Sequence, residues 1–306
     1  MQTLLSSIKW RVTKPEYLFQ PAAILRRLLR GRRSAAVTPY LTVKLNWGLS
    51  LRVKTNDALS SGILQTRVDD ITQSEIVWRL LCPGETALDI GANIGYVSSI
   101  MAARVGPGGR VLAFEPHPGL CEELRKNVSG WDGLRDKVEV HETALSERGG
   151  KGSLCVPPAF AANRGISRVL ALADGGVGET SVPIELRRLD DVWESDSPIA
   201  LMKIDVEGHE LAVLRGAQRL LKRRLIRNIV FEDFGGRQSE SMRLLKDSGY
   251  TIWQTAPELL GPRLLAPGAS PPPPWLPPNY VASLTPEHVL ERIRARGWQV
   301  LQSGKS

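Results

Sequence analysis

The residues most able to do chemistry in this chain lie around a glycine turn. Asp89 falls in a short apolar run, Gly91 and Gly95 follow it, and helix-forming residues continue to Ala103. This layout is typical of a buried strand whose end bends over a ligand. Twenty positions after Gly95, Glu115 ends a second apolar run, where nucleoside-binding α/β folds place the carboxylate that binds ribose hydroxyls. The pattern therefore indicates a ligand that contains a nucleoside.

The spacing of the glycines narrows the choice of ligand. Dinucleotide enzymes use G-x-G-x-x-G, so that a pyrophosphate lies against a helix N-terminus. Here Gly91 and Gly95 are four positions apart, Asp89 precedes them, and no lysine follows as in a P-loop. A carboxylate in this place repels a pyrophosphate but suits an ammonium and a sulfonium group. We therefore predict S-adenosylmethionine as the cofactor; the alternative is a tight turn that binds no ligand.

Composition places the chain among ordinary globular proteins. Of its 306 residues 42% are hydrophobic and 24% are charged. The three cysteines have no metal-like spacing, which favours reduced thiols. No apolar run approaches the roughly 20 residues that span a bilayer, and the first residues contain no continuous apolar segment of a secretory signal. We therefore expect a cytoplasmic protein.

The positive charge is concentrated at the start of the chain. The net charge is +8, and residues 1–54 contain eleven Lys and Arg but one acid, Glu16. Residues 22–33 fit a short cationic amphipathic helix, so peripheral membrane contact through this arm is one interpretation. A solvated arm that packs on the domain is the other. We predict a basic arm and hairpin over 1–69 and a domain that binds S-adenosylmethionine over 70–306.

Strand-like and helix-like segments alternate after residue 70, which predicts an α/β fold: a Rossmann-like, mostly parallel sheet of seven strands with helices on both faces. An insertion with strand-like pieces at 152–156 and 182–186 occupies 146–190, and a loop with seven prolines occupies 267–278. The predicted strands are 87–90, 111–115, 138–141, 199–204, 228–231, 250–254 and an antiparallel 279–284. The predicted helices are 70–81, 95–105, 118–128, 208–221, 239–248 and 286–296, and a hairpin is expected over 41–53.

Two blocks carry a resemblance to a known family. The first is Leu88–Tyr96 with Ala113–Pro116, and the second is Leu201–Ala217, which contains Lys-Ile-Asp-Val-Glu-Gly followed by His209 and Glu210. Together they resemble the FkbM-type S-adenosylmethionine-dependent methyltransferases over roughly residues 70–255. The resemblance implies the class I methyltransferase fold and, for the most part, O-methylation of sugars, polyketides or other small hydroxylated metabolites.

Topology and resemblance jointly predict the cofactor site. Asp89 is expected near the amino group of the methionine part, and Glu115 on the ribose hydroxyls. Residues after the third strand are expected to border the adenine. The predicted cofactor-binding residues are Asp89, Gly91, Asn93, Gly95, Tyr96, Glu115, Thr143 and Ala144.

The acceptor side is predicted from acids at the carboxyl ends of later strands. Because its ordinary pKa is near 6.5, His209 is the predicted general base. Asp205 or Glu232 can serve instead or orient it, and Glu207 lies on the same turn. A divalent metal on Asp205, Glu232 and Asp233 is a third option, although Lys203 argues against it. Glu207 and Glu210 also have the spacing of a capping box, so a purely structural role stays open.

Other functions fit the sequence less well. A nicotinamide dehydrogenase needs a different glycine spacing, and an amino-methyltransferase of nucleic acids needs an Asn/Asp-Pro-Pro-Tyr block where this chain has Asp205–Gly208. No nucleic-acid partner is therefore expected. A degenerate methyltransferase fold that only binds a partner, or an N-methyltransferase, stays as the alternative to O-methylation.

Overall fold

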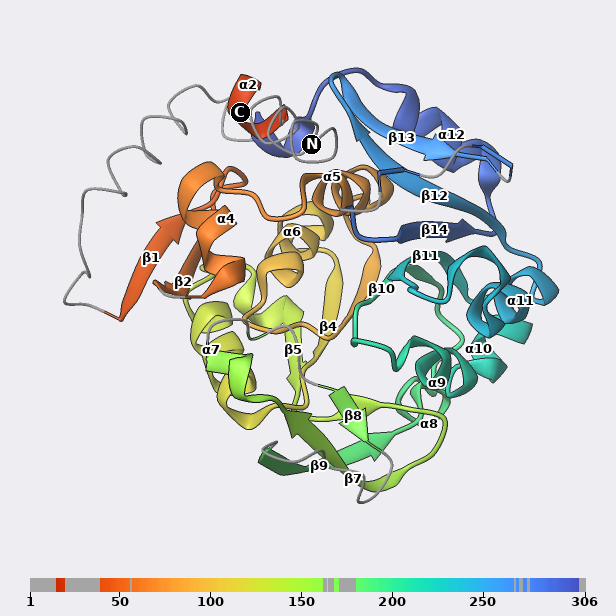
Figure 1. Ribbon diagram of the computed structural model, residues 1–306, viewed down its shortest axis with the longest axis horizontal. Helices are drawn as coiled ribbons and strands as arrows, with labels where there is room; N and C mark the ends of the chain where they lie inside the picture. The colour runs from red at the N-terminus through yellow and green to blue at the C-terminus, as the bar shows by residue number, and fades with distance from the viewer. Residues whose placement is uncertain are drawn as a thin grey trace, which may run out of the picture.

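A large twisted sheet with helices on both faces organises the molecule (Figure 1). The computed structural model describes residues 15–19, 39–55, 57–161, 164, 168–170, 180–266, 268–269, 272–273 and 276–302. The predicted amphipathic helix over 22–33 lies outside these ranges. Within them the predicted Rossmann-like α/β fold is confirmed.

The central sheet contains eight strands in the order β13-β12-β14-β11-β10-β3-β4-β5. The five strands from β11 to β5 run parallel, β14 is antiparallel to both of its neighbours, and β13 is antiparallel to β12. The eighth strand arises because the chain turns back at Leu259–Leu260 and pairs β13 with β12. The strands are β3 Thr86–Ile90, β4 Arg110–Phe114, β5 Val138–His141, β10 Ile199–Ile204, β11 Ile226–Glu232, β12 Thr251–Glu258, β13 Gly261–Leu265 and β14 Asn279–Ser283.

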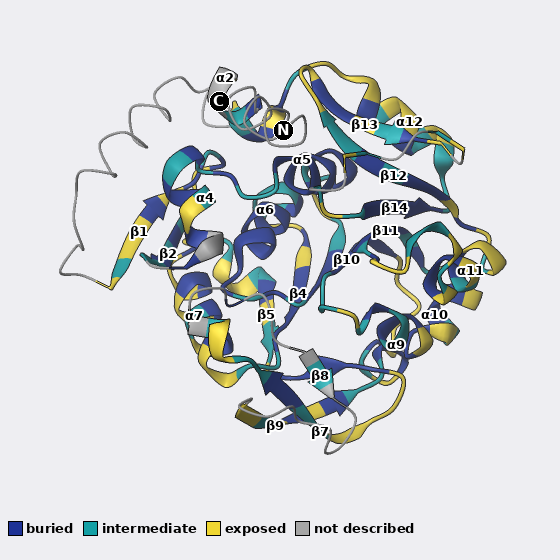
Figure 2. Ribbon diagram, in the orientation of Figure 1, coloured by how far each residue is buried: buried dark blue, intermediate teal, exposed yellow. Residues whose placement is uncertain are grey.

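Successive side chains of each central strand are buried on opposite faces of this sheet. Ala87 and Val111 belong to one hydrophobic core, whereas Leu88 and Leu112 belong to the other. This period of two is the pattern of a strand buried on both faces. Figure 2 shows the strands as mostly buried and the outer sides of the covering helices as exposed. The first core is covered by α5 Ile71–Leu80, α6 Tyr96–Val105, α7 Pro118–Ser129 and α12 Pro286–Arg294, and the second by α8 Leu189–Val192, α9 Glu210–Arg215, α10 Gln218–Lys222 and α11 Glu240–Asp247.

One predicted helix is divided in two. The helix predicted over 208–221 ends at Arg215 and a second one starts at Gln218. Gly216 lies between them, where a Cβ atom would come within 2.0 Å of the carbonyl oxygen of Ser146. The backbone of Gly216 therefore packs directly against the chain that leads into the insertion, and its carbonyl accepts a hydrogen bond from Asp190. The N–H of Leu220 donates to Asp190 Oδ1 instead of to the carbonyl of Gly216, so the helix is interrupted here.

The insertion forms a small sheet of its own below the carboxyl ends of β4 and β5 in Figure 1. Its strand order is β6-β9-β7-β8, and β7 and β9 pair antiparallel over seven residues. Both strand-like pieces predicted in this segment are therefore present. The strands are β6 Ala144–Leu145, β7 Gly150–Val156, β8 Arg168–Leu170 and β9 Thr180–Arg187.

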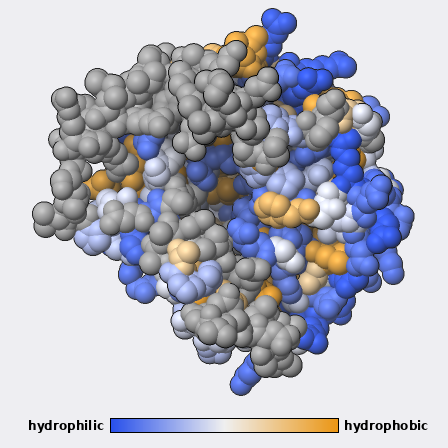
Figure 3. Space-filling model, in the orientation of Figure 1, coloured by the Kyte–Doolittle hydropathy of each residue, from blue (hydrophilic) through white to orange (hydrophobic). Residues whose placement is uncertain are grey.

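The surface is largely hydrophilic where it can be seen. On the face shown in Figure 3, most described side chains are hydrophilic and the hydrophobic ones lie in small separate groups. Among the described residues, no helix has both the length and the apolar character that crossing a membrane requires.

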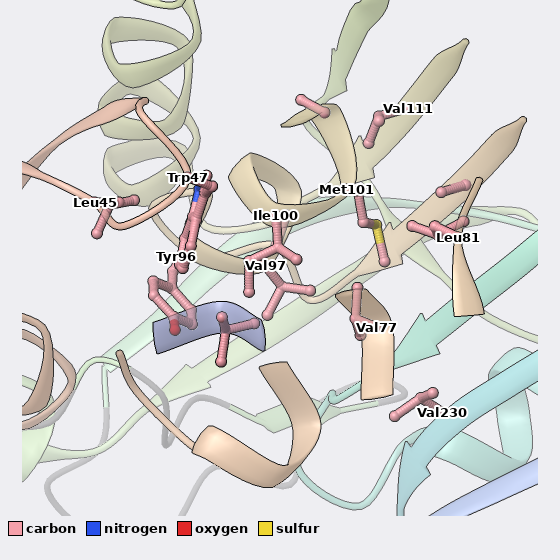
Figure 4. Packing of buried hydrophobic residues seen from close by; sticks show 14 of the residues in the cluster. Leu45, Trp47, Val77, Leu81, Tyr96, Val97, Ile100, Met101, Val111 and Val230 are labelled. Carbon is pink, nitrogen blue, oxygen red and sulfur yellow. The ribbon is translucent and has the colours of Figure 1, made fainter. Parts of the chain in front are cut away.

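The predicted hairpin is formed by β1 Tyr40–Lys44 and β2 Ser50–Lys54, with α4 Ala58–Thr66 after it. It packs on the domain through fully buried Leu51 and through Trp47, whose indole N–H donates to Ser99 Oγ at 3.1 Å. Figure 4 shows Trp47 beside Tyr96 and above the packed side chains of α5 and α6. The hairpin thus shares the core of the domain. The boundary predicted between residues 69 and 70 stays a proposal.

Candidate active site

A cavity of about 430 Å³ opens at the carboxyl ends of β3, β4, β10 and β11. The strand order reverses between β3 and β10, and the crevice at such a switch point is where open α/β sheets bind ligands. The volume lies in the range of sites for small organic ligands. Ten of the predicted site residues line it: Gly91, Asn93, Tyr96, Glu115, Thr143, Ala144, Asp205, Glu207, His209 and Glu232.

Gly91 lets the chain turn at the floor of the cavity. Its φ is +77°, and a Cβ atom on it would come within 1.9 Å of the carbonyl oxygen of Asp205. The N–H groups of Gly91 and Ala92 both donate to the carbonyl of Phe114, at 3.0 Å. Only glycine allows this approach of strand ends, so the position must be glycine for steric reasons.

Gly95 has a different task from the one predicted. It begins α6 with φ +92°, and a Cβ atom on it would meet Leu124 of α7 at 2.5 Å. Gly95 is absent from the described cavity wall. Its small size therefore serves the packing of α6 against α7.

Glu115 presents a carboxylate to the cavity, as predicted from its position after β4. It is 5% exposed, Oε2 accepts the backbone N–H of Asn93 at 2.8 Å, and Oε1 accepts that of His117 at 2.9 Å. Burial raises the pKa of Glu115 to about 7, against the lowering effect of these hydrogen bonds. Each oxygen keeps lone pairs free for further donors such as hydroxyl groups.

Asp89 lies behind the cavity wall, which corrects the expectation of direct contact with a ligand's amino group. It is fully buried, accepts a hydrogen bond from Ser98 Oγ at 2.5 Å, and lies 3.3 Å from Lys203 Nζ. A fully buried carboxylate needs such partners because desolvation of an unpaired charge is costly. Lys203, which lines the cavity, lies between Asp89 and the cavity.

Lys203 joins the two central strands beneath the cavity and was not predicted as a site residue. Its Nζ donates to the carbonyl of Gly91 at 2.8 Å and lies 3.6 Å from Asp205 Oδ2. Burial alone would lower the pKa of Lys203, but the carboxylates of Asp89 and Asp205 outweigh burial and raise it. The ammonium therefore stays charged and holds the glycine turn in place.

The wall beyond Glu115 is mainly apolar. Phe114, Leu120, Leu145 and Leu154 line it, which suits the face of a flat heterocycle. Thr143 and Ala144 lie beside them, as predicted for the adenine border, although the Thr143 hydroxyl already donates to the carbonyl of Glu185 at 2.9 Å.

The opposite end of the cavity is acidic. Asp205 directly follows β10, Glu207 lies on the turn after it with φ +48°, and Glu232 ends β11. Burial, together with the negative charges of Asp205 and Glu207, raises the pKa of Glu232 to about 8. This pKa is close to neutral pH, which suits a general base.

Two of the candidate acids accept hydrogen bonds from neighbouring groups of the protein. Glu210 Oε1 accepts the N–H of Gly208 at 3.0 Å, which fits its capping role. Both oxygens of Asp233 are engaged, one with the N–H of Gly235 and one with Ser239 Oγ. Within the described residues, no group of three His, Cys, Asp or Glu side chains is arranged to hold a metal ion.

His209 lines the cavity and contacts the insertion. Its Nε2 lies 3.0 Å from Ser146 Oγ, next to the adenine border predicted after β5. Burial lowers the pKa of His209, partly offset by Glu147, so the ring is neutral at pH 7. The structure thus gives His209 a partner in the insertion.

Helix α5 and the insertion supply further wall residues that the motifs did not reveal. Asp70 caps α5 through the N–H groups of Thr72 and Gln73, and it accepts a third hydrogen bond from Asn279 at 2.7 Å. Its capping position before an amphipathic helix was readable, but its place over the cavity depends on tertiary packing. The additional wall residues that carry polar groups are Asp69, Asp70, Gln73, Arg164 and Lys203.

A family model described as the methyltransferase FkbM domain matches residues 89–252, which is more than half of the chain. This segment runs from β3 to β12 and contains both blocks of site residues. The chain belongs to the FkbM methyltransferase family. The family's methyl donor is S-adenosylmethionine.

Similar proteins include other methyltransferases. Methyltransferase sdnD of Sordaria araneosa is 32% identical over 54% of this FkbM-family chain and 73% of its own length. Hexuronic acid methyltransferase AglP of Haloferax volcanii is 28% identical over 51% of this chain and 61% of its own. The solved structure of the methyltransferase FkbM from Methylobacillus flagellatus superposes with a TM-score of 0.42 and 19% identity, over 65% of this chain and 43% of that one. The chain thus spans less than two thirds of the last two proteins.

Proposed function

We propose that this FkbM-family methyltransferase methylates a hydroxyl group of a small sugar-like or polyketide-like acceptor. The observation that carries the proposal is one cavity with Glu115 at an apolar end and Asp205 with Glu232 at an acidic end. The first end fits a nucleoside, and the second supplies proton acceptors for a hydroxyl. The similarity to AglP, a hexuronic acid methyltransferase, supports a carbohydrate acceptor.

The described residues fit S-adenosylmethionine. Glu115 would hold the ribose hydroxyls, the apolar wall would hold the adenine, and the turn at Gly91 would leave space for the methionine part. When bound, the cofactor supplies a methyl group activated by a sulfonium. The net negative wall of the cavity favours this cationic donor electrostatically.

Methylation of a hydroxyl forms an O–CH3 bond and breaks the S–CH3 bond, and the hydroxyl proton must go to the protein. We assign this proton to Glu232, with Asp205 beside it, because these carboxylates share the acidic end of the cavity. His209 remains the competing candidate, since its neutral ring can also accept a proton. The remaining role of the walls is to align donor and acceptor and to exclude water.

The cofactor half of the proposal predicts a result for Glu115→Gln. Each oxygen of Glu115 accepts a backbone N–H, so a glutamine amide would place its NH2 group against one of these donors. We expect S-adenosylhomocysteine to bind about 5- to 150-fold more weakly, the range for one charged hydrogen-bond partner. Calorimetric titration measures this, and Glu194→Gln, on an exposed loop, is the control.

The same residue predicts a pH dependence. The pKa of Glu115 is raised to about 7, and only the ionised carboxylate accepts two hydroxyl donors. Affinity for S-adenosylhomocysteine should therefore increase as the pH rises through about 7 and level off above it. Glu115→Gln should lose this rise; an unchanged pH profile in the variant would contradict the ribose role.

The catalytic half predicts a contrast between Glu232→Gln and His209→Ala. Loss of a general base costs about 10²- to 10⁴-fold in turnover, so we expect this loss for Glu232→Gln and a few-fold effect for His209→Ala. Wild-type turnover should rise with pH through about 8, as Glu232 becomes ionised. A screen of hydroxylated sugars with labelled methyl donor supplies the assay. Loss of turnover in His209→Ala alone would assign the base to His209.

Peripheral membrane contact through the basic arm stays a proposal. Residues 1–54 carry its charge, and only 15–19 and 39–54 of them are described. Sedimentation of the full chain with anionic vesicles, compared with neutral ones, tests this contact.

A further inference from the structure

One hydrogen-bond donor of the cavity wall has no partner in the protein. Arg164, in the insertion, lines the cavity and is 5% exposed. Within the part of the chain that the structure describes, its Nε is buried and forms no hydrogen bond. A buried donor without a partner is costly. Because Arg164 borders the cavity, a ligand bound there can supply the missing acceptor.

The rest of Arg164 is held in place by the domain. Its Nη1 donates to Glu123 Oε1 of α7 at 2.7 Å, and its Nη2 donates to Asp57 Oδ2 at 3.4 Å. The backbone N–H of Arg164 donates to the other oxygen of Asp57 at 3.2 Å. Asp57 is 3% exposed and precedes α4 as its N-cap residue. The Nε–H group is therefore fixed before a ligand arrives, which lowers the entropy lost on binding.

Neighbouring contacts place Arg164 at the nucleoside end of the cavity. The ring of Phe160 stacks on that of His117, with centroids 4.8 Å apart, so this part of the insertion lies over the turn that follows Glu115. Burial lowers the pKa of His117, and the nearby charge of Arg164 adds to this lowering. Helix α7 starts after His117 and carries Leu120, which lines the cavity.

The surroundings of Arg164 restrict the partner of its Nε–H group. Two carboxylates, those of Asp57 and Glu123, already balance its positive charge. The neighbouring wall from the insertion is apolar, with Leu154 and Val169. A neutral acceptor atom on a flat apolar ring suits such a place better than an anion does. The adenine ring has this character, because its faces are apolar and N1, N3 and N7 on its edges accept hydrogen bonds.

We infer that Arg164 is a cofactor-binding residue whose Nε–H donates to a ring nitrogen of the adenine of S-adenosylmethionine. The insertion then contributes a polar contact to the edge of the base as well as an apolar wall for its face. Arg164 lies between the two blocks of site residues, so the motifs did not reveal it. The inference rests on the proposed placement of the nucleoside beside Glu115 and adds the group that recognises the base.

The test uses S-adenosylhomocysteine and its 1-deaza, 3-deaza and 7-deaza analogues, each of which has C–H in place of one ring nitrogen. We expect the wild-type protein to bind at least one analogue about 10- to 100-fold more weakly than S-adenosylhomocysteine, the range for a hydrogen bond from a charged group. In Arg164→Lys a methylene group takes the place of Nε, and the positive charge between Asp57 and Glu123 is kept. This variant should bind S-adenosylhomocysteine more weakly by the same factor. It should also bind the weakened analogue as well as it binds S-adenosylhomocysteine, because the two losses remove one interaction.

Two further variants separate this contact from a structural role of Arg164. Glu123→Gln weakens the ion pair but keeps the Nε–H group, so the difference between the analogues should persist. Arg148→Lys, at an exposed position of the insertion, is the matched control and should keep the wild-type affinities. Equal binding of all four ligands by the wild-type protein, or undiminished discrimination by Arg164→Lys, would overturn the inference. Failure of the wild-type protein to bind S-adenosylhomocysteine would instead refute the proposed function.

Discussion

Gly91→Ala should abolish binding of S-adenosylhomocysteine and lower the stability of the fold. The residue has φ +77°, and the new methyl carbon would lie 1.9 Å from the carbonyl oxygen of Asp205. That oxygen belongs to the backbone at the end of β10, so it cannot move aside as a flexible side chain can. Either β3 and β10 separate at their carboxyl ends or the turn is displaced into the cavity. We expect a loss of several kcal/mol, about the size of a severe core defect.

Gly84 provides a matched control for this substitution. Its φ is +84°, almost the same as that of Gly91, but no atom lies within 4 Å of the place a Cβ would occupy. Gly84→Ala should therefore cost only the conformational penalty, about 1–2 kcal/mol, and leave binding intact. Thermal unfolding and calorimetric titration of both variants distinguish the conformational penalty from the steric clash with Asp205. Equal effects of the two substitutions would show that the contact with Asp205 is unimportant.

Lys203→Met should destabilise the protein by about 3–5 kcal/mol, as expected when one partner of a buried ion pair is removed. Asp89 is fully buried and would keep Ser98 as its remaining partner. The carbonyl of Gly91 would also lose the hydrogen bond from Lys203. We therefore expect weaker binding of S-adenosylhomocysteine together with the loss of stability. Chemical denaturation measures the first effect and titration the second.

A second substitution shows whether the loss of stability in Lys203→Met comes from an unpaired buried charge or from poor packing. In the Lys203→Met background, Asp89→Asn removes the unpaired negative charge and should recover a large part of the lost stability. Lys222→Met, on the exposed end of α10, should change stability by less than about 0.5 kcal/mol. If Asp89→Asn gives no recovery, the loss comes from packing around the methionine and not from the buried carboxylate.

The acids of the cavity follow from where strands end. In a parallel sheet the carboxyl ends of all strands meet at one edge, so Glu115, Asp205 and Glu232 are collected there although the chain separates them widely. Burial raises the pKa of Glu115 to about 7, and burial together with the negative charges of Asp205 and Glu207 raises the pKa of Glu232 to about 8. When a cationic methyl donor binds, its charge offsets the repulsion between these carboxylates and should lower their pKa values.

Much of this arrangement was present in the sequence alone. The alternation of apolar segments with helical ones predicted the sheet, because strands buried on both faces are continuously apolar. The glycine turn at Gly91, Glu115 after β4 and the acids after β10 and β11 are local features, since each lies at a strand end that the pattern marks. The predicted cofactor followed from the same residues.

Only the tertiary structure decided which of these groups meet. The motif could not reveal that Asp89 turns to Lys203 and away from the cavity, or that Gly95 packs against Leu124. His209 contacts Ser146 because the backbone of the insertion passes close to α9. Gln73 lines the cavity because α5 packs across strands β10, β11, β12 and β13. Such contacts join residues far apart in the chain, and their formation depends on how helices and strands pack, which local sequence patterns do not encode.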